Sequence, residues 1–134
     1  MLCVMFARQP AARWVGSLLL AVCVGCGSSS GPWKLDAEIA RESLEASLKA
    51  WKAGEPASSL EQKSPKIIVG DVDWSAGKKL LEFKIRDEES NEGTNLRKSV
   101  ELTVQAESGP PLRVEAAYLI STRPVITVFR QETE

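Results

Sequence analysis

The sequence predicts an α+β fold in which one long N-terminal amphipathic helix packs on a curved, four- to five-stranded antiparallel meander. Apolar residues recur every three or four positions between residues 33 and 51, but every second position after Pro65. The segments between the later stretches are short and turn-like, which favours antiparallel hairpins. A helix with one apolar stripe then buries that stripe against the apolar face of the sheet.

The predicted helix begins near Pro32, a residue suited to the first helical turn, and ends before Gly54. Its apolar stripe has the spacing of a single helix face. The stripe consists of Trp33, Ala37, Ala40, Leu44, Leu48 and Trp51. Gly54 suits the C-terminal cap, and Pro56 cannot continue the helix.

Alternation of apolar and polar residues predicts the strands that follow. The predicted strands are 67–69, 79–86, 99–106, 112–120 and 125–129. The last of them is β-branched and nearly all apolar, as expected for a strand covered on both faces. The short connections include residues 75–78 between the first two strands, so each strand is expected to pair with the next.

The first part of the chain has a different character. Residues 14–25 form an apolar run, but a membrane-spanning helix needs about 20 such residues. Arg8 and Arg13 precede the run, and the first acidic residue is Asp36. A basic leader, a short apolar stretch and an exit of small residues indicate a secretory signal peptide.

The end of this leader, V24-G25-C26-G27, resembles a bacterial lipobox. The resemblance implies cleavage before Cys26 and acylation of its thiol, with fatty acids such as palmitate anchoring the protein in a lipid bilayer. Cys23 occupies the position that leucine normally fills in this motif. The alternative is ordinary signal-peptidase cleavage among residues 25–28, which would release a soluble secreted protein.

The predicted organisation is therefore a signal peptide over residues 1–25, an acylated cysteine and flexible tether over 26–31, and a single α+β domain over 32–134. The domain is expected to be exported and to face the periplasm or the cell surface. Whether the lipobox resemblance implies the inner or the outer membrane stays open.

Composition excludes several classes of function for this domain. The 134-residue chain has no histidine, and its three cysteines, Cys3, Cys23 and Cys26, lie in the leader or at its edge. The domain therefore forms no disulfide and lacks the commonest general base and metal ligand. Without Arg8 and Arg13, 15 basic residues face 18 acidic ones, a net charge of −3. No dense basic stripe is present, so nucleic-acid binding is not expected.

Two acidic segments are candidate cation sites. Asp71 and Asp73 would share one face of a strand, where they would bind a cation or raise each other's pKa. The favoured interpretation is a polar strand end with Trp74 in the core, so no metal is predicted. Residues 87–93 resemble a calcium loop, but the glycine comes one place late and Lys98 stands where a glutamate should close the site. A solvated hairpin tip is favoured there.

Two aromatic residues are candidates for a ligand pocket. If the sheet curls into a cone, Trp74 and Tyr118 would line a pocket for a small apolar ligand. The alternative is that both are ordinary core residues.

Segments 64–74 (SPKIIVGDVDW) and 118–130 (YLISTRPVITVFR) resemble parts of uncharacterised small bacterial lipoproteins. A helix followed by an antiparallel meander is similar to the cystatin-like or nuclear-transport-factor-like arrangement. The resemblance implies a fold but no activity. True cystatins inhibit proteases through a Gln-x-Val-x-Gly hairpin, which this chain lacks, so inhibition is not expected.

An enzyme is not predicted, because the domain offers no histidine to activate a serine. No cofactor is predicted either. The leading hypothesis is a membrane-tethered, non-catalytic envelope module that is structural or binds another envelope protein. The alternative is a carrier or sensor of a small apolar ligand, and an acid-pair hydrolase is a distant third.

Overall fold

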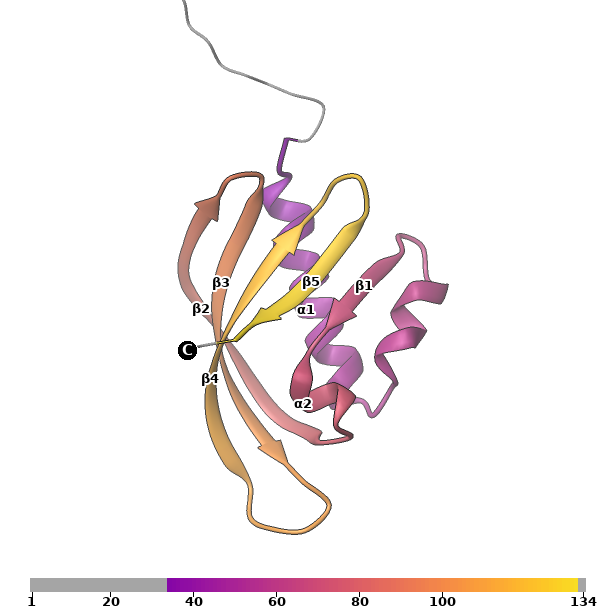
Figure 1. Ribbon diagram of the computed structural model, residues 1–134, viewed down its shortest axis with the longest axis vertical. Helices are drawn as coiled ribbons and strands as arrows, with labels where there is room; N and C mark the ends of the chain where they lie inside the picture. The colour runs from indigo at the N-terminus through magenta and orange to yellow at the C-terminus, as the bar shows by residue number, and fades with distance from the viewer. Residues whose placement is uncertain (1–33, 133–134) are drawn as a thin grey trace, which may run out of the picture.

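The computed structural model describes residues 34–132, which form an α+β fold with a five-stranded, mostly antiparallel sheet and a helix on one face (Figure 1). The predicted leader, Cys26, the tether, Pro32 and Trp33 lie outside the described residues. Within residues 34–132, none of the helices has the length and apolar character needed to cross a membrane.

Helix α1 runs from Ala37 to Lys52. It begins later than predicted, because Asp36 is extended and its carboxylate accepts a hydrogen bond from the Ile39 N–H at 3.2 Å. This N-terminal cap replaces the predicted start at Pro32. The helix ends as predicted, since Gly54 follows it in the left-handed conformation with a φ of 81°.

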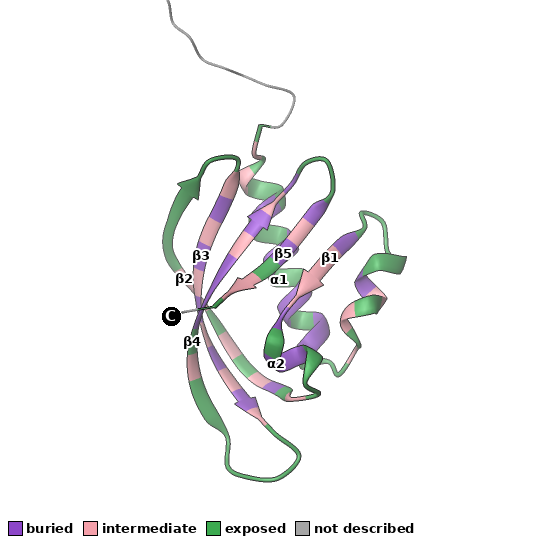
Figure 2. Ribbon diagram, in the orientation of Figure 1, coloured by how far each residue is buried: buried purple, intermediate pink, exposed green. Residues whose placement is uncertain are grey.

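The face of α1 that packs on the sheet contains four residues of the predicted stripe, Ala40, Leu44, Leu48 and Trp51. Its buried residues are Ala40, Ser43, Leu44, Ser47, Leu48, Ala50 and Trp51. Ser47 compensates its burial by donating a hydrogen bond to the Ser43 carbonyl at 2.7 Å. Figure 2 shows the same pattern as buried segments along the helix and alternating burial along the strands.

The five strands are arranged in the order β1-β5-β4-β3-β2. Their bounds are Ile67–Gly70 (β1), Lys79–Glu92 (β2), Asn95–Gln105 (β3), Leu112–Ser121 (β4) and Ile126–Gln131 (β5). Strands β2 to β5 form an antiparallel meander, which is the predicted part of the topology.

The predicted pairing of the first two strands is wrong. Strand β1 lies at the opposite edge from β2 and pairs in parallel with β5, with Ile67 beside Ile126 (Figure 1). The connection is no hairpin turn, because a short helix, α2 (Val72–Ser75), follows β1 and redirects the chain. A 3₁₀-helix, η1 (Ala57–Gln62), precedes β1 and packs beside it.

The core lies between α1 and the inner face of the sheet. It combines the helix stripe with alternate residues of every strand, such as Leu96, Val100 and Leu102 of β3. At the C-terminal end of α1, Trp51 stacks on Trp74 of α2, with ring centroids 5.4 Å apart. This stacking holds α2 against the helix, so the segment that follows β1 has a defined position.

Candidate functional site: a buried ion-pair cluster beside a pocket

The candidate site begins where β1 ends. Asp71 caps α2, and its Oδ1 atom accepts hydrogen bonds from the N–H groups of Asp73, at 2.8 Å, and Trp74, at 3.1 Å. The prediction that Asp71 and Asp73 lie along one strand is therefore wrong. A carboxylate that accepts two successive N–H groups favours a helix start over an extended chain.

Asp71 also joins this helix cap to the sheet. Its Oδ2 atom accepts a hydrogen bond from the Tyr118 hydroxyl, and its Oδ1 atom lies 3.5 Å from Nη1 of Arg130. Tyr118 and Arg130 are direct partners across β4 and β5, so both side chains project from the same face of the sheet. The Asp71 side chain is 1 % exposed, so these hydrogen bonds and the Arg130 cation take the place of water around it.

Asp73 extends the same network. Its Oδ1 atom lies 2.7 Å from Nζ of Lys78, and its Oδ2 atom accepts a hydrogen bond from Nη1 of Arg130. We call Asp71, Asp73, Lys78, Tyr118 and Arg130 the Asp71 cluster. Two carboxylates face two cations in it, so the formal charge is balanced while Tyr118 is neutral.

The protonation states of the cluster follow from burial and pairing. Burial opposes the charged form of Asp73, but the hydrogen bonds from Lys78 and Arg130 outweigh it and lower its pKa. Burial and the negative charge of Asp71 raise the pKa of Tyr118. Burial opposes the charged form of Arg130 as well, but its pKa is raised by Asp73 and Asp71. The cluster therefore holds an ionised Asp73, a neutral Tyr118 and a charged Arg130 at neutral pH.

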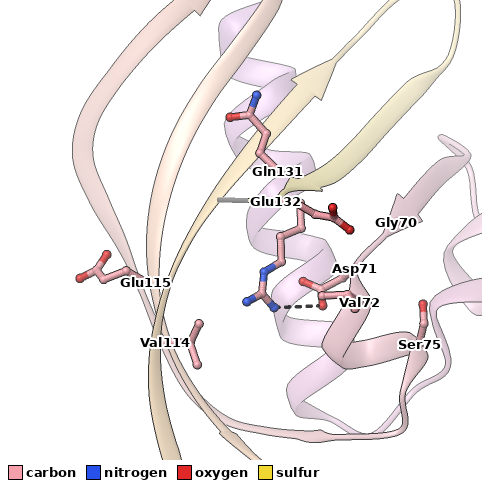
Figure 3. Close-up of a pocket in the computed structure, with 9 residues that line it drawn as sticks. Gly70, Asp71, Val72, Ser75, Val114, Glu115, Gln131 and Glu132 are labelled. Carbon is pink, nitrogen blue, oxygen red and sulfur yellow. Dashed lines mark hydrogen bonds and ion pairs between the residues drawn. The ribbon is translucent and has the colours of Figure 1, made fainter. Parts of the chain in front are cut away.

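A pocket of about 590 Å³ lies beside the cluster (Figure 3). Val72 and Ser75 of α2 form one side and Val114 and Glu115 of β4 the other. Among the described residues, β5 ends at Gln131, opposite Ala117, so residues 112–116 of β4 have no partner from β5 beside the pocket. Asp71 and Arg130 line its wall.

The two predicted pocket aromatics both hydrogen-bond to Asp71, Trp74 through its backbone N–H and Tyr118 through its hydroxyl. Trp74 is 9 % exposed, stacks on Trp51, and donates its indole N–H to the Glu55 carbonyl at 3.1 Å. Tyr118 is 1 % exposed, and its hydroxyl is bound to Asp71. Neither residue belongs to the wall of the 590 Å³ pocket, but Trp74 and Trp51 line a separate pocket of about 370 Å³.

Sequence reasoning missed Lys78 and Arg130. A usable signal existed for Arg130, which falls two residues after Val128 and four after Ile126 on the inward side of the strand. A charged residue at an inward position indicates a buried partner of opposite charge. Lys78 gave no such signal, because its pairing with Asp73 depends on the turn that follows α2.

The calcium-like segment 87–93 lies in the β2–β3 hairpin, where its side chains are exposed. Glu89 accepts a hydrogen bond from Nε of Arg41 at 2.9 Å and lies 3.3 Å from Nζ of Lys98. Arg41 and Lys98 thus pair with Glu89, one of the carboxylates that a calcium ion bound to this segment would need. In the part of the chain that the structure describes, no three side chains of metal-ligating types converge.

Comparisons with known proteins found no similar protein. No family model matches the chain, and no curated protein or solved structure is significantly similar to it. Inferences about function therefore rest on the residues and their geometry alone.

Proposed function

We propose that the chain is an exported, lipid-anchored and non-catalytic envelope module that binds another envelope protein. The observation that carries the proposal is the leader, a short apolar run over residues 14–25 that ends in the lipobox-like V24-G25-C26-G27. Acylation at Cys26 would hold the domain at a bilayer surface through the segment that precedes Lys34. A module held in this way encounters its partners at the membrane.

The Asp71 cluster supports a non-catalytic role. A general base needs a lone pair that is free to accept a proton and a pKa near the working pH. Asp71 accepts from two backbone N–H groups and from Tyr118, while Asp73 pairs with Lys78 and Arg130, and its pKa is lowered. Both carboxylates are therefore occupied by contacts that hold α2 against the sheet.

A binding surface is supported by the apolar residues beside the pocket. Val72 lines the pocket and is 58 % exposed, and Phe129, which pairs with Gly70 across β1 and β5, is 45 % exposed. A Cβ atom at Gly70 would lie 2.7 Å from Cδ1 of Phe129, so the ring rests directly on the glycine backbone. Exposed apolar groups at the rim of a concave, polar pocket suit a protein interface, in which a side chain of the partner enters the pocket.

The anchor is tested by metabolic labelling with an alkyne fatty acid. The wild-type protein should carry the label, and the Cys26→Ser variant should not. Equal labelling of both proteins would contradict acylation at Cys26.

The binding surface is tested with a photo-crosslinking amino acid placed at position 72 or 129 in intact cells. We expect one reproducible crosslinked protein from both positions, and none from position 42 on the exposed side of α1. Equal yields from position 42, or no product from positions 72 and 129, would contradict the proposal.

A small apolar ligand is the second candidate, because Trp51 and Trp74 line the 370 Å³ pocket. A fatty acid or a hydrophobic dye bound there would quench the fluorescence of these indoles. Replacement of Trp74 by phenylalanine should weaken that binding while preserving the stacked arrangement. Unchanged fluorescence across a titration would exclude this candidate.

We also propose a more specific fold for the domain. The helix across the face of the meander supports a cystatin-like or nuclear-transport-factor-like domain, whereas the parallel β1–β5 pair departs from a purely antiparallel meander. An experimental structure compared with both folds tests this assignment.

A further inference from the structure

Strand β2 presents a free edge of the sheet. Within residues 34–132 it pairs with β3 on one side and has no strand on the other, because it is the last strand in the order β1-β5-β4-β3-β2. Figure 1 shows β2 along one outer margin of the sheet. Alternate residues of such an edge direct their N–H and C=O groups away from the sheet, so the edge can accept another strand.

The regular part of this edge is short. Register shifts between Leu80 and Glu82, and between Ile85 and Glu89, interrupt the pairing of β2 with β3. The uninterrupted segment between them is 82–85. Bulges discourage non-specific edge pairing, so a partner strand has to match these four residues.

The four residues alternate between two faces of the sheet. Phe83 and Ile85 pack against the core and are half-buried. Glu82 and Lys84 project from the other face, where both are exposed and neither forms an ion pair with a residue in 34–132. The segment therefore offers a partner strand an apolar face and two opposite charges.

The charges around this segment are balanced. Residues 79–88 contain three basic and three acidic side chains, so no net charge opposes the approach of an identical edge. Glu101 of β3 is in register with Lys84, but it pairs with Arg86 at 3.1 Å. The acidic β2–β3 hairpin tip lies at one end of the strand, so an antiparallel copy places the two tips at opposite ends of the contact.

We propose that two copies of the chain pair antiparallel through β2, with a twofold axis at Phe83, and so join their sheets. Directly opposite residues of an antiparallel pair lie on the same face, so the axis has to pass through a residue and not between two. The two Phe83 rings then meet on the inner face. A pocket of about 390 Å³ lies there between α1 and β2, and Phe83 and Ile85 line it.

Among these registers, charge selects the one centred on Phe83. It places Glu82 of each copy opposite Lys84 of the other, which gives two cross-strand pairs of opposite charge. An axis at Glu82 or at Lys84 would bring identical charges together. An axis at Ile85 would place Lys84 opposite Arg86.

This pairing leaves the proposed binding surface accessible. Strands β1 and β2 are the two opposite edges of the sheet, and Val72 and Phe129 lie at the β1 edge. A second copy on β2 therefore does not cover them. The inference depends neither on the anchor at Cys26 nor on the partner proposed for that surface.

Charge reversal in the full chain tests the pairing. The mass is measured by sedimentation equilibrium in a nonionic detergent over a range of concentrations, and the wild type should form dimers. Glu82→Lys places two lysines at each of the two contacts, so the dissociation constant should rise about tenfold or more. Lys84→Glu should weaken the dimer in the same way through pairs of glutamates. The combined variant Glu82→Lys with Lys84→Glu exchanges the charges and should restore the dimer.

A matched control makes the same change of charge elsewhere. Glu107 is exposed in the turn between β3 and β4, so Glu107→Lys should leave the dissociation constant unchanged. Recovery in the combined variant excludes misfolding as the cause of the single effects. Equal dissociation constants in all five proteins would overturn the pairing through β2. A monomeric wild type would overturn it too, and would leave the edge to a strand of a different protein.

Cross-linking between isotopically different copies tests the register. Unlabelled and ¹⁵N-labelled full chains are mixed and treated with a carbodiimide, which joins a carboxylate directly to an amine. Mass spectrometry should find peptides in which Glu82 of one isotope is linked to Lys84 of the other. Links confined to single-isotope peptides would show that the two residues do not meet across a dimer, and would overturn the proposed register.

Discussion

The Asp71 cluster and the ion pairs around Glu89 are built from similar groups in different surroundings. Each joins carboxylate, arginine and lysine side chains from elements far apart in the chain: Asp71 and Arg130 are 59 residues apart, and Arg41 and Glu89 are 48. The side chains of Asp71 and Arg130 are 1 % and 13 % exposed, whereas those of Arg41 and Glu89 are 48 % and 27 % exposed.

Solvent access determines how much each ion pair contributes to stability. At the surface, water solvates either partner when the other is removed, so a pair adds little. In the interior, the loss of one partner leaves an uncompensated charge, so breaking the pair is costly even where forming it gains little. We therefore expect the Asp71 cluster to determine whether the fold forms, and the Glu89 pairs to adjust its stability slightly.

The largest expected effect follows from Asp71→Ala. The substitution removes the α2 cap and the acceptor for Tyr118, and it leaves Arg130 with Asp73 alone, so the free energy of unfolding should fall by about 3–5 kcal/mol. Urea denaturation monitored by tryptophan fluorescence measures it. Asp36→Ala is the matched control, because it removes an exposed cap of α1 and should cost only about 1 kcal/mol. If both variants lost the same free energy of unfolding, burial would not make the Asp71 cluster more important for stability than an exposed helix cap.

A smaller effect is expected from Tyr118→Phe. Asp71 loses one donor while the ring remains, so the free energy of unfolding should fall by about 1–3 kcal/mol. The wild type should also lose stability as the pH rises above about 10, because the unfolded tyrosine releases its proton while the raised pKa retains it in the folded protein. That alkaline loss should be shallower in the variant, and identical alkaline slopes would contradict the buried hydrogen bond.

The smallest effect is expected from Glu89→Gln, at about 0.2–1 kcal/mol near neutral pH and less in high salt. The hydrogen bond from Arg41 lowers the pKa of Glu89 from 4.5 to about 2. Its contribution should therefore be complete above about pH 4.5 and should disappear as the pH falls toward 2. Wild type and variant should converge in denaturation curves across this window. A difference that persists at pH 2 would show that the carboxylate acts through something other than its charge.

Local periodicity predicted most of the fold. The helix stripe and the alternation in β2 to β5 are patterns that nearby residues impose. Strands β4 and β5 lie within two residues of the predicted bounds, whereas α1 begins later than predicted, β3 begins four residues earlier and β2 continues six residues further, to Glu92. The parallel partner of β1 was not predictable in this way. Whether a four-residue strand pairs with β2 or with β5 depends on where α2 and the Trp51–Trp74 stack place it.

The candidate site was predictable only in part. The pattern Asp-Val-Asp-Trp indicates a polar site, but its alternation suits a strand as well as a helix cap. Only the hydrogen bonds that Asp71 accepts from the N–H groups of Asp73 and Trp74 distinguish the two. Burial of Trp74 agrees with the favoured interpretation of that segment. Arg130 and Lys78 complete the cluster through long-range packing, which a single sequence does not record.

The parallel pairing of β1 with β5 also affects how the protein is made. Its partner is the last strand, so a nascent chain cannot complete the sheet until almost all of it has been synthesised. The contacts of Arg130 with Asp71 and Asp73 form at the same late stage. On the proposal that the chain is exported, this delay favours passage through a translocation channel, because the sheet stays incomplete until β5 emerges.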